Sequence, residues 1–160
     1  MSEDVVKKVS AGVIPYREGG EEVEYLLLSH ELGHWSFPKG TVGEEEEVTT
    51  AALRLLEEET GISAEEVDLE TDTERTIEYS YEREGKKHQK TVYLYPGKVD
   101  PGVGVEIAPE MNDFEWMTIE EATVQMTYPE PRRLLEEFHK EKYGETSEEP
   151  LIDTSLLDEE

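Results

Sequence analysis

The sequence predicts one α/β domain built around a mixed β-sheet. At 160 residues the chain is long enough for a single domain with a sizeable core and too short for two comfortable ones. Segments with the alternating pattern of strands are interleaved with segments of helical periodicity, and no internal repeat is present. This regular patterning also favours a folded protein over a disordered acidic chain. We expect the domain to span residues 1–144 and the acidic segment 145–160 to form a flexible tail.

The N-terminal half predicts a β-hairpin, a shaped loop and one helix. Residues 9–16 and 23–29 are short β-rich runs separated by a turn-forming cluster that contains two glycines. Residues 33–40 mix aromatic side chains with Pro and Gly, so we expect a shaped loop or a short strand there. From about residue 45 to residue 59 there are no helix breakers, and Gly61 follows as a natural C-terminal stop, which predicts a helix.

The C-terminal half predicts a second hairpin and three further elements. Residues 75–81 and 90–95 have strand patterning, and we expect the charged segment 82–89 to connect them. The further elements are a strand at 114–117, a short helix at 119–124 and an amphipathic helix at 131–142.

Charge is the most unusual bulk property of the chain. It has 15 Lys and Arg against 41 Asp and Glu, which gives a net charge of −26. Such a surface repels nucleic acid and anionic lipid, so we expect neither as a partner. At molar salt the Debye length falls to about 3 Å and repulsion among carboxylates is screened, so the acidity predicts a protein from a halophilic source.

The composition also restricts the site and the compartment. The chain has no cysteine, so any metal must bind to oxygen or histidine. No segment approaches the roughly 20 apolar residues of a membrane span, and the N-terminus lacks the apolar run of a signal peptide. We expect a soluble cytoplasmic protein, and no feature indicates an obligate protein partner.

Glycines and charged residues with a defined spacing surround the predicted helix. They are Gly40, Glu46, Arg54, Glu58, Glu59, Gly61 and Ile62. At 100° per residue Glu58 and Glu59 fall on one side of a helix, and hard cations such as Mg²⁺ bind carboxylate oxygens and bridge phosphate oxygens. We therefore expect this segment to hold a divalent cation against a pyrophosphate. The alternative is a solvated acidic face, which the spacing disfavours.

This spacing resembles the Nudix box, in which Gly, Glu, Arg-Glu, Glu-Glu and Gly stand at the same intervals. The chain is identified on this pattern as a member of the Nudix hydrolases. Residues 35–40, Trp-Ser-Phe-Pro-Lys-Gly, resemble the entry to the box in diadenosine tetraphosphate hydrolases, and residues 90–93 resemble one of their strands. The resemblance implies a Nudix-type α/β/α sandwich in which the box forms a loop-helix-loop.

The resemblance also implies roles for acidic residues. The implied metal ligands are Gly40, Glu58, Glu59 and Glu110, with Mg²⁺ as the cofactor and Mn²⁺ as a possible substitute. The implied catalytic residues are Glu58, Glu110 and Arg54, of which Arg54 positions the box carboxylates. Glu110 comes from a loop outside the box.

The implied substrate is a small nucleotide. His34, Lys39, Lys90 and Tyr81 are the implied substrate-binding residues, in which the two lysines contact phosphate and Tyr81 stacks on a nucleobase. The predicted reaction is metal-dependent hydrolysis of a nucleoside polyphosphate, with a dinucleoside tetraphosphate as the first choice, by attack of water on phosphorus.

The chain departs from the box at Leu55, where the family has a Glu that is commonly a metal ligand and often proposed as the base. Leucine can do neither, and Glu57 points to the opposite side of the helix, so Glu110 is the preferred substitute. Glu46 and Gly61 are expected to be structural. Two alternatives stay open: a catalytically impaired Nudix module that binds nucleotide or a protein partner, and a diphosphoinositol-phosphate hydrolase or decapping-type pyrophosphatase. The acidity disfavours the second.

Overall fold

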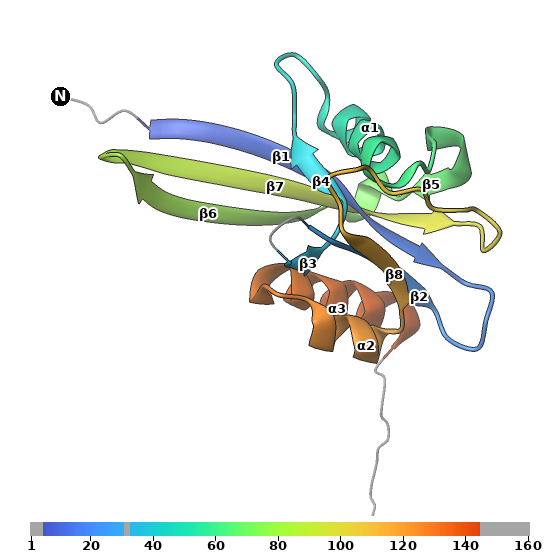
Figure 1. Ribbon diagram of the computed structural model, residues 1–160. Coiled ribbons are helices and arrows are strands. Elements are labelled where there is room, and N and C mark those ends of the chain that lie inside the picture. Colours follow the sequence, from blue (N-terminus) through green and yellow to red (C-terminus); the bar gives the residue numbers. More distant parts are fainter. Residues whose placement is uncertain (1–4, 31–32, 145–160) are drawn as a thin grey trace, which may run out of the picture.

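A single β-sheet lies between helices in the computed structural model, which describes residues 5–30 and 33–144; the predicted tail at 145–160 lies outside the described residues (Figure 1). The strands are β1 (Val5–Arg17), β2 (Glu24–Ser29), β3 (Trp35–Ser36), β4 (Lys39–Thr41), β5 (Val67–Leu69), β6 (Arg75–Arg83), β7 (Lys86–Val99) and β8 (Asp113–Met117). The helices are α1 (Val48–Thr60), α2 (Ile119–Gln125) and α3 (Pro129–Tyr143), with 3₁₀ turns η1 (Ala64–Glu66) and η2 (Thr71–Thr73).

The sheet is mixed, as predicted. Its central order is β3-β2-β1-β7-β5, while β4 pairs with β1, β6 with β7 and β8 with β2. β1 and β7 run parallel, in a register that begins with Val5 opposite Lys87 and ends with Tyr16 opposite Lys98. The other pairings among the described strands are antiparallel.

Alternate residues of β1 enter two separate cores, because successive side chains of a strand point to opposite faces of the sheet. Ala11 and Val13 belong to the cluster that contains the buried residues of α1. Ile14 and Tyr16 belong to the cluster that contains the buried residues of α2 and α3. One helix therefore covers one face and two helices cover the other, which confirms the predicted α/β/α sandwich (Figure 1).

Three strands project beyond the helices and form what we call the arm: residues 5–9 of β1, 78–83 of β6 and 86–91 of β7 (Figure 1). The predicted second hairpin is confirmed, but the predicted connection at 82–89 is wrong. The strands meet at a two-residue turn, Glu84-Gly85, with φ of 54° and 76°, which suits a tight hairpin. Polar exposed side chains hide the strand pattern here, while β7 is paired on both sides and so continues.

The box helix begins three residues later than predicted and ends one residue later, at Thr60, directly before the predicted stop at Gly61. Glu45 has a φ of 67°, and the N–H of Glu46 donates to the Gly43 carbonyl over 3.2 Å, so this segment is a turn. At the other end Gly61 adopts a left-handed φ of 76° and its N–H donates to the Glu57 carbonyl over 2.9 Å. This is the conformation that favours glycine after a helix.

The remaining elements agree with the sequence, with shifted ends. β1 begins four residues earlier than predicted, at Val5, and α3 begins at Pro129 rather than Pro131, since proline is tolerated in a first helical turn. The expected short structure at 33–40 contains β3 and β4, whereas the three-residue β5 was missed. None of the helices within the described residues is long and apolar enough to cross a membrane.

Candidate active site

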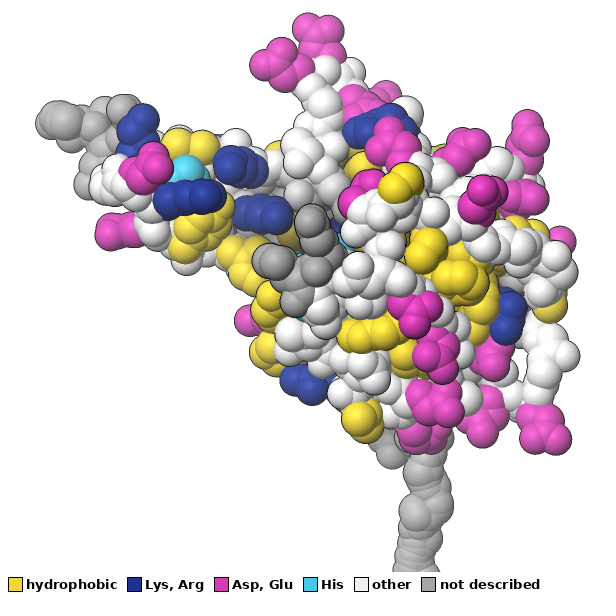
Figure 2. Space-filling model, in the orientation of Figure 1, with side chains coloured by type: hydrophobic (Ala, Val, Ile, Leu, Met, Phe, Trp, Pro, Cys, Tyr) yellow, Lys and Arg dark blue, Asp and Glu magenta, His cyan; other side chains and the backbone are white. Residues whose placement is uncertain are grey.

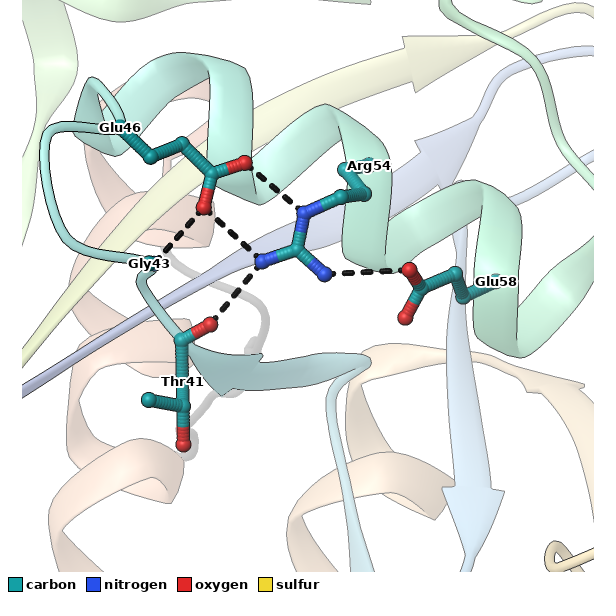
Figure 3. A network of polar contacts seen from close by, with 5 residues as sticks. All are labelled: Thr41, Gly43, Glu46, Arg54 and Glu58. Carbon is teal, nitrogen blue, oxygen red and sulfur yellow. Dashed lines mark hydrogen bonds and ion pairs between the residues drawn. The ribbon is translucent and has the colours of Figure 1, made fainter.

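Arg54 of α1 joins the loop before the helix to the acidic end of the helix. Its Nε and Nη2 donate to the carboxylate of Glu46 over 2.8 and 2.9 Å, Nη2 also donates to the Thr41 carbonyl over 3.0 Å, and Nη1 donates to Glu58 over 3.0 Å (Figure 3). The Gly43 N–H donates to Glu46 over 2.8 Å. Arg54 and then Gly43 lower the pKa of Glu46 to about 2. The box loop and Glu58 are thus held by one guanidinium.

Glu59 is the buried carboxylate of the box. It is 9% exposed and accepts the backbone N–H of Lys39 over 3.1 Å. The pKa of Glu59 is raised to about 7, mainly by burial; the N–H and the charge of Lys39 oppose this rise, and the carboxylates of Glu110 and Glu58 add to it. A cation beside this carboxylate would favour its charged form.

Leu55 lies where the family pattern has a glutamate, and its side chain is part of the core. It is 6% exposed and belongs to the same cluster as Ala52 and Leu56. Its Cδ2 would lie 2.7 Å from a β-carbon placed on Gly40, so leucine fits closely against the glycine of the box. At this position an apolar side chain packs against Gly40, and no carboxylate is present.

Glu110 approaches the box from the loop between β7 and β8. The N–H of Glu106 donates to the Thr60 carbonyl over 2.8 Å, and the N–H of Ala108 donates to the Glu59 carbonyl over 3.2 Å, so this loop follows the end of α1. Glu110 itself is exposed, and it is close enough for its charge to raise the pKa of Glu59. Glu110 therefore lies near Glu59, one of the acidic residues with which the sequence analysis grouped it.

A pocket of about 220 Å³ lies on the sheet face covered by α3. It is lined by Ser36, Lys39, Tyr79, Lys90, Val92, Tyr128 and Pro131. The pKa of Lys39 is lowered, first by burial and then by the charge of Lys90, so the two cations are close neighbours. The hydroxyl of Ser36 is buried and has no hydrogen-bond partner among the described residues. The pocket therefore brings together two like charges and a buried hydroxyl that lacks a hydrogen-bond partner among the described residues.

His34 lies beside this pocket. Its ring stacks on that of His30 with centroids 4.7 Å apart and an interplanar angle of 3°, and its centroid is 5.7 Å from that of Tyr128. Burial, followed by the charge of Lys39, lowers the pKa of both imidazoles, that of His30 to about 4. Neutral imidazole is therefore the favoured form of each ring at pH 7.

Tyr81 is not among the residues that line the pocket; it stacks on His88 in the arm. Tyr79 lines the pocket instead, directly opposite Lys90 in the β6–β7 register. The sequence analysis did not single out Tyr79 or Tyr128. The strand period could have identified Tyr79, since it shares a face with Tyr81, whereas Tyr128 reaches the pocket only through the packing of α3.

Comparison with known proteins settles the family. The sequence model of the NUDIX domain matches residues 6–138, which is most of the chain and includes the whole box. The chain belongs to the Nudix family. The matched region also contains the pocket and Glu110, so the Nudix domain includes every residue that the sequence analysis assigned to the site.

Within the Nudix family, the chain is similar to asymmetrical bis(5′-nucleosyl)-tetraphosphatases. It is 31% identical over 131 residues to the Caenorhabditis elegans enzyme, covering 81% of this chain and 92% of that one. It is 31% identical over 121 residues to the Mus musculus enzyme, covering 74% and 80%. The structure of a C. elegans Ap4A hydrolase binary complex matches with a TM-score of 0.75 over 86% of this chain and 98% of that one. The chain is a Nudix pyrophosphohydrolase related to these enzymes.

Nudix enzymes generally use divalent metals, and the donor chemistry of this Nudix box fits such an ion. Glu58, Glu59 and Glu110 offer carboxylate oxygens, which hard divalent cations prefer. Within residues 5–30 and 33–144, no three Asp, Glu or His side chains are already grouped as a metal site. Glu58 is paired with Arg54 and Glu59 accepts an N–H, so binding an ion requires these carboxylates to share or exchange partners.

Proposed function

We propose that this Nudix protein hydrolyses a dinucleoside tetraphosphate into two nucleotides. The observation that carries the proposal is the pairing of Lys39 and Lys90 in one pocket of a chain with a net charge of −26. The two positive charges repel each other, and the pKa of Lys39 is lowered first by burial and then by the charge of Lys90. An anion between them relieves that repulsion, and a polyphosphate chain offers several anionic groups to both lysines.

The aromatic residues of the pocket support a nucleoside at one end of that chain. Tyr79 and Tyr128 both line the pocket, and tyrosine rings bind flat bases by stacking while their hydroxyl groups bond to polar edges. The similarity to bis(5′-nucleosyl)-tetraphosphatases supports the same substrate class. His34, next to Tyr128, would border the bound nucleotide.

In the proposed reaction, water attacks a phosphorus atom of the polyphosphate. A P–O bond to the water oxygen forms, and the bridging P–O bond to the departing nucleotide breaks. A proton of the water passes to a carboxylate, for which we propose Glu110, and the two products together contain the atoms of the substrate and one water. Lys39 and Lys90 bind and orient the phosphates through these steps.

The proposed cofactor is Mg²⁺, with Mn²⁺ as a substitute. When bound, such a cation neutralises the negative charge that develops on the phosphate oxygens. The residues that would hold it are the carbonyl of Gly40 and the carboxylates of Glu58, Glu59 and Glu110. Arg54 keeps the Glu58 side chain at this end of the helix.

Leu55 supports a second candidate function, a Nudix module that binds nucleotide without turnover. A buried leucine packed against Gly40 supplies neither a ligand nor a base at that position. The pocket and its lysines would remain able to bind a nucleotide.

One assay separates the two candidates. Diadenosine tetraphosphate is incubated with the protein and Mg²⁺ or Mn²⁺ in molar KCl, and the nucleotide products are separated by chromatography. We expect hydrolysis that EDTA abolishes, and a loss of kcat/KM of tenfold or more in Lys90→Met. Lys87→Met, on the same strand but the opposite sheet face, is the control. Binding without turnover would support the second candidate. Faster cleavage of capped RNA or a diphosphoinositol phosphate would refute the assignment of a dinucleoside tetraphosphate as the substrate.

A further inference from the structure

Positive charge is concentrated on the arm. Of the 15 Lys and Arg in the chain, six lie there: Lys7, Lys8, Arg83, Lys86, Lys87 and Lys90. Figure 2 shows Lys and Arg side chains gathered over this projection, while Asp and Glu side chains are spread over most of the rest of the visible surface (Figure 2). The arm is therefore the part of this acidic molecule that is most favourable for an anion.

The strand registers divide the arm into two faces. Residues directly opposite each other in neighbouring strands share a face, and alternate residues of one strand do too. Tyr79 lies opposite Lys90, Lys90 opposite Lys8, and Tyr81 opposite His88. The face that these pairs define, here named the basic aromatic face, consists of Val6, Lys8, Tyr79, Tyr81, Arg83, Lys86, His88 and Lys90.

The basic aromatic face carries no carboxylate side chain. The acidic residues of β6 within the arm, Glu78 and Glu82, fall on the opposite face by the same alternation. In a chain with 41 Asp and Glu, this separation leaves Lys8, Arg83, Lys86 and Lys90 as the formally charged residues of this face. Such a surface attracts an anion along its whole length.

The pocket of the proposed active site adjoins this face, since Tyr79 and Lys90 belong to both. A volume of about 220 Å³ is less than the roughly 300 to 1,000 Å³ of a typical small-molecule site. It can hold only part of a substrate that contains two nucleosides and four phosphates. The remainder must extend out of the pocket, and the basic aromatic face continues from Lys90 for roughly 13 Å to Lys86.

An aromatic pair lies along that path. The rings of Tyr81 and His88 are stacked with centroids 5.0 Å apart and an interplanar angle of 6°, and Tyr81 is 37% exposed. Two parallel rings anchored on paired strands form a flat surface on which a nucleobase can stack. Cations on both sides of the pair, Lys90 toward the pocket and Lys86 toward the turn, suit the phosphates attached to such a base.

We propose that the basic aromatic face binds the remote nucleotide of a dinucleoside polyphosphate, with its base on the Tyr81–His88 pair and its phosphates beside Lys90 and Lys86. The proposal rests on the proposed function, because it assigns the half of the substrate that the pocket does not contain. The arm thereby selects substrates with a second nucleoside over mononucleotides.

The test compares two ligands that differ only in the second nucleoside. Isothermal titration calorimetry in EDTA measures the binding of a nonhydrolysable, methylene-bridged diadenosine tetraphosphate and of adenosine 5′-tetraphosphate with the same methylene bridges. Tyr81→Ala is expected to weaken binding of the dinucleotide about tenfold, the size of one lost base stack, and to leave the mononucleotide within twofold. Tyr81→Phe retains the ring and should bind as the wild type does.

Lys86 and Lys87 supply a matched pair of charge variants, because they are adjacent, both exposed and on opposite faces. Lys86→Ala should weaken the dinucleotide several-fold, with a smaller loss at higher KCl, and Lys87→Ala should not. Equal losses in the two lysine variants, unchanged binding in Tyr81→Ala, or equal losses for both ligands would overturn the proposal. A capped RNA oligonucleotide is titrated as a third ligand. If Tyr81→Ala weakens only the binding of that RNA, the proposal is also overturned. If the wild type binds the nonhydrolysable dinucleotide neither in EDTA nor with Mg²⁺, the proposed function fails instead.

Discussion

The backbone N–H of Lys39 donates to the carboxylate of Glu59 over 3.1 Å and so joins β4 to the last turn of α1. The same two residues present opposite charges to the site: the Lys39 side chain lines the pocket, and Glu59 is a proposed metal ligand. This hydrogen bond links the proposed phosphate-binding residue Lys39 to the proposed metal ligand Glu59. We therefore expect the ionisation of Glu59 to affect the binding of phosphate as well as of metal.

The first prediction concerns the pH dependence of stability. The pKa of Glu59 is raised from 4.5 to about 7, so folding favours the protonated carboxyl. Its contribution to the free energy of unfolding is fully present below pH 4.5 and is lost as the pH rises through 7. Glu59→Gln stays neutral. In EDTA it should gain stability relative to the wild type across this range, on the order of 3 kcal/mol above pH 7. Urea unfolding of both proteins from pH 5 to 9 measures the difference. Glu57→Gln, on the exposed side of α1, is the control, and a difference independent of pH would contradict the assignment.

The second prediction concerns Leu55. Leu55→Glu places a carboxylate in an apolar cluster and should destabilise the metal-free protein by roughly 2 to 4 kcal/mol. Mg²⁺ should recover much of that loss and increase hydrolysis, since the family ligand is restored. Leu55→Gln has a similar shape without the charge and should not respond to Mg²⁺. Thermal unfolding with and without Mg²⁺ measures both, and a Leu55→Glu protein that is indifferent to the ion would show that the site is built around leucine.

The third prediction concerns the planar fork of Arg54. Arg54→Lys keeps the charge but cannot bond simultaneously to Glu46, Thr41 and Glu58, so the box carboxylates lose their positions. We expect kcat/KM to fall by roughly tenfold or more, with a weaker apparent Mg²⁺ affinity. Steady-state kinetics over a range of Mg²⁺ concentrations provides the measurement. Arg133→Lys changes an exposed ion pair on α3 and should have little effect; equal effects in both variants would count against the network.

The fourth prediction concerns the proposed base. Glu110→Gln should lower kcat by about 100-fold or more while the protein remains folded, the size expected when acid-base help is lost. Glu106→Gln removes an exposed carboxylate from the same loop and controls for loop charge. Rates are measured at saturating diadenosine tetraphosphate and Mg²⁺. Near wild-type turnover of Glu110→Gln would exclude this residue as the base.

The fifth prediction concerns salt. A net charge of −26 gives strong repulsion among carboxylates in dilute buffer, and molar KCl screens it. The urea midpoint should therefore rise steadily from 0.1 to 3 M KCl, as expected of a protein adapted to high salt. A midpoint that is already maximal at 0.1 M KCl would count against that adaptation.

The box helix and the hairpins were predictable because their signals are local, whereas the α/β/α arrangement followed from the resemblance to the Nudix box. The helix around Arg54 follows from spacing and from Gly61, and the two hairpins follow from alternation. The pocket was only half predictable: Lys39 and Lys90 were named because the resemblance implies that they contact phosphate. The strand period that Tyr79 shares with Tyr81 could have identified Tyr79, whereas only the packing of α3 reveals the position of Tyr128. The arm was missed because its exposed polar residues give no apolar alternation.

The parallel pairing of β1 with β7 also determines when the arm can form as the chain folds. The β6–β7 hairpin closes through a two-residue turn, but a lone hairpin is marginal in water. Its third strand pairs Val5 with Lys87, 82 positions later, and such distant segments meet only after the chain between them has condensed. We therefore expect the arm to form late in folding, after the rest of the domain has assembled.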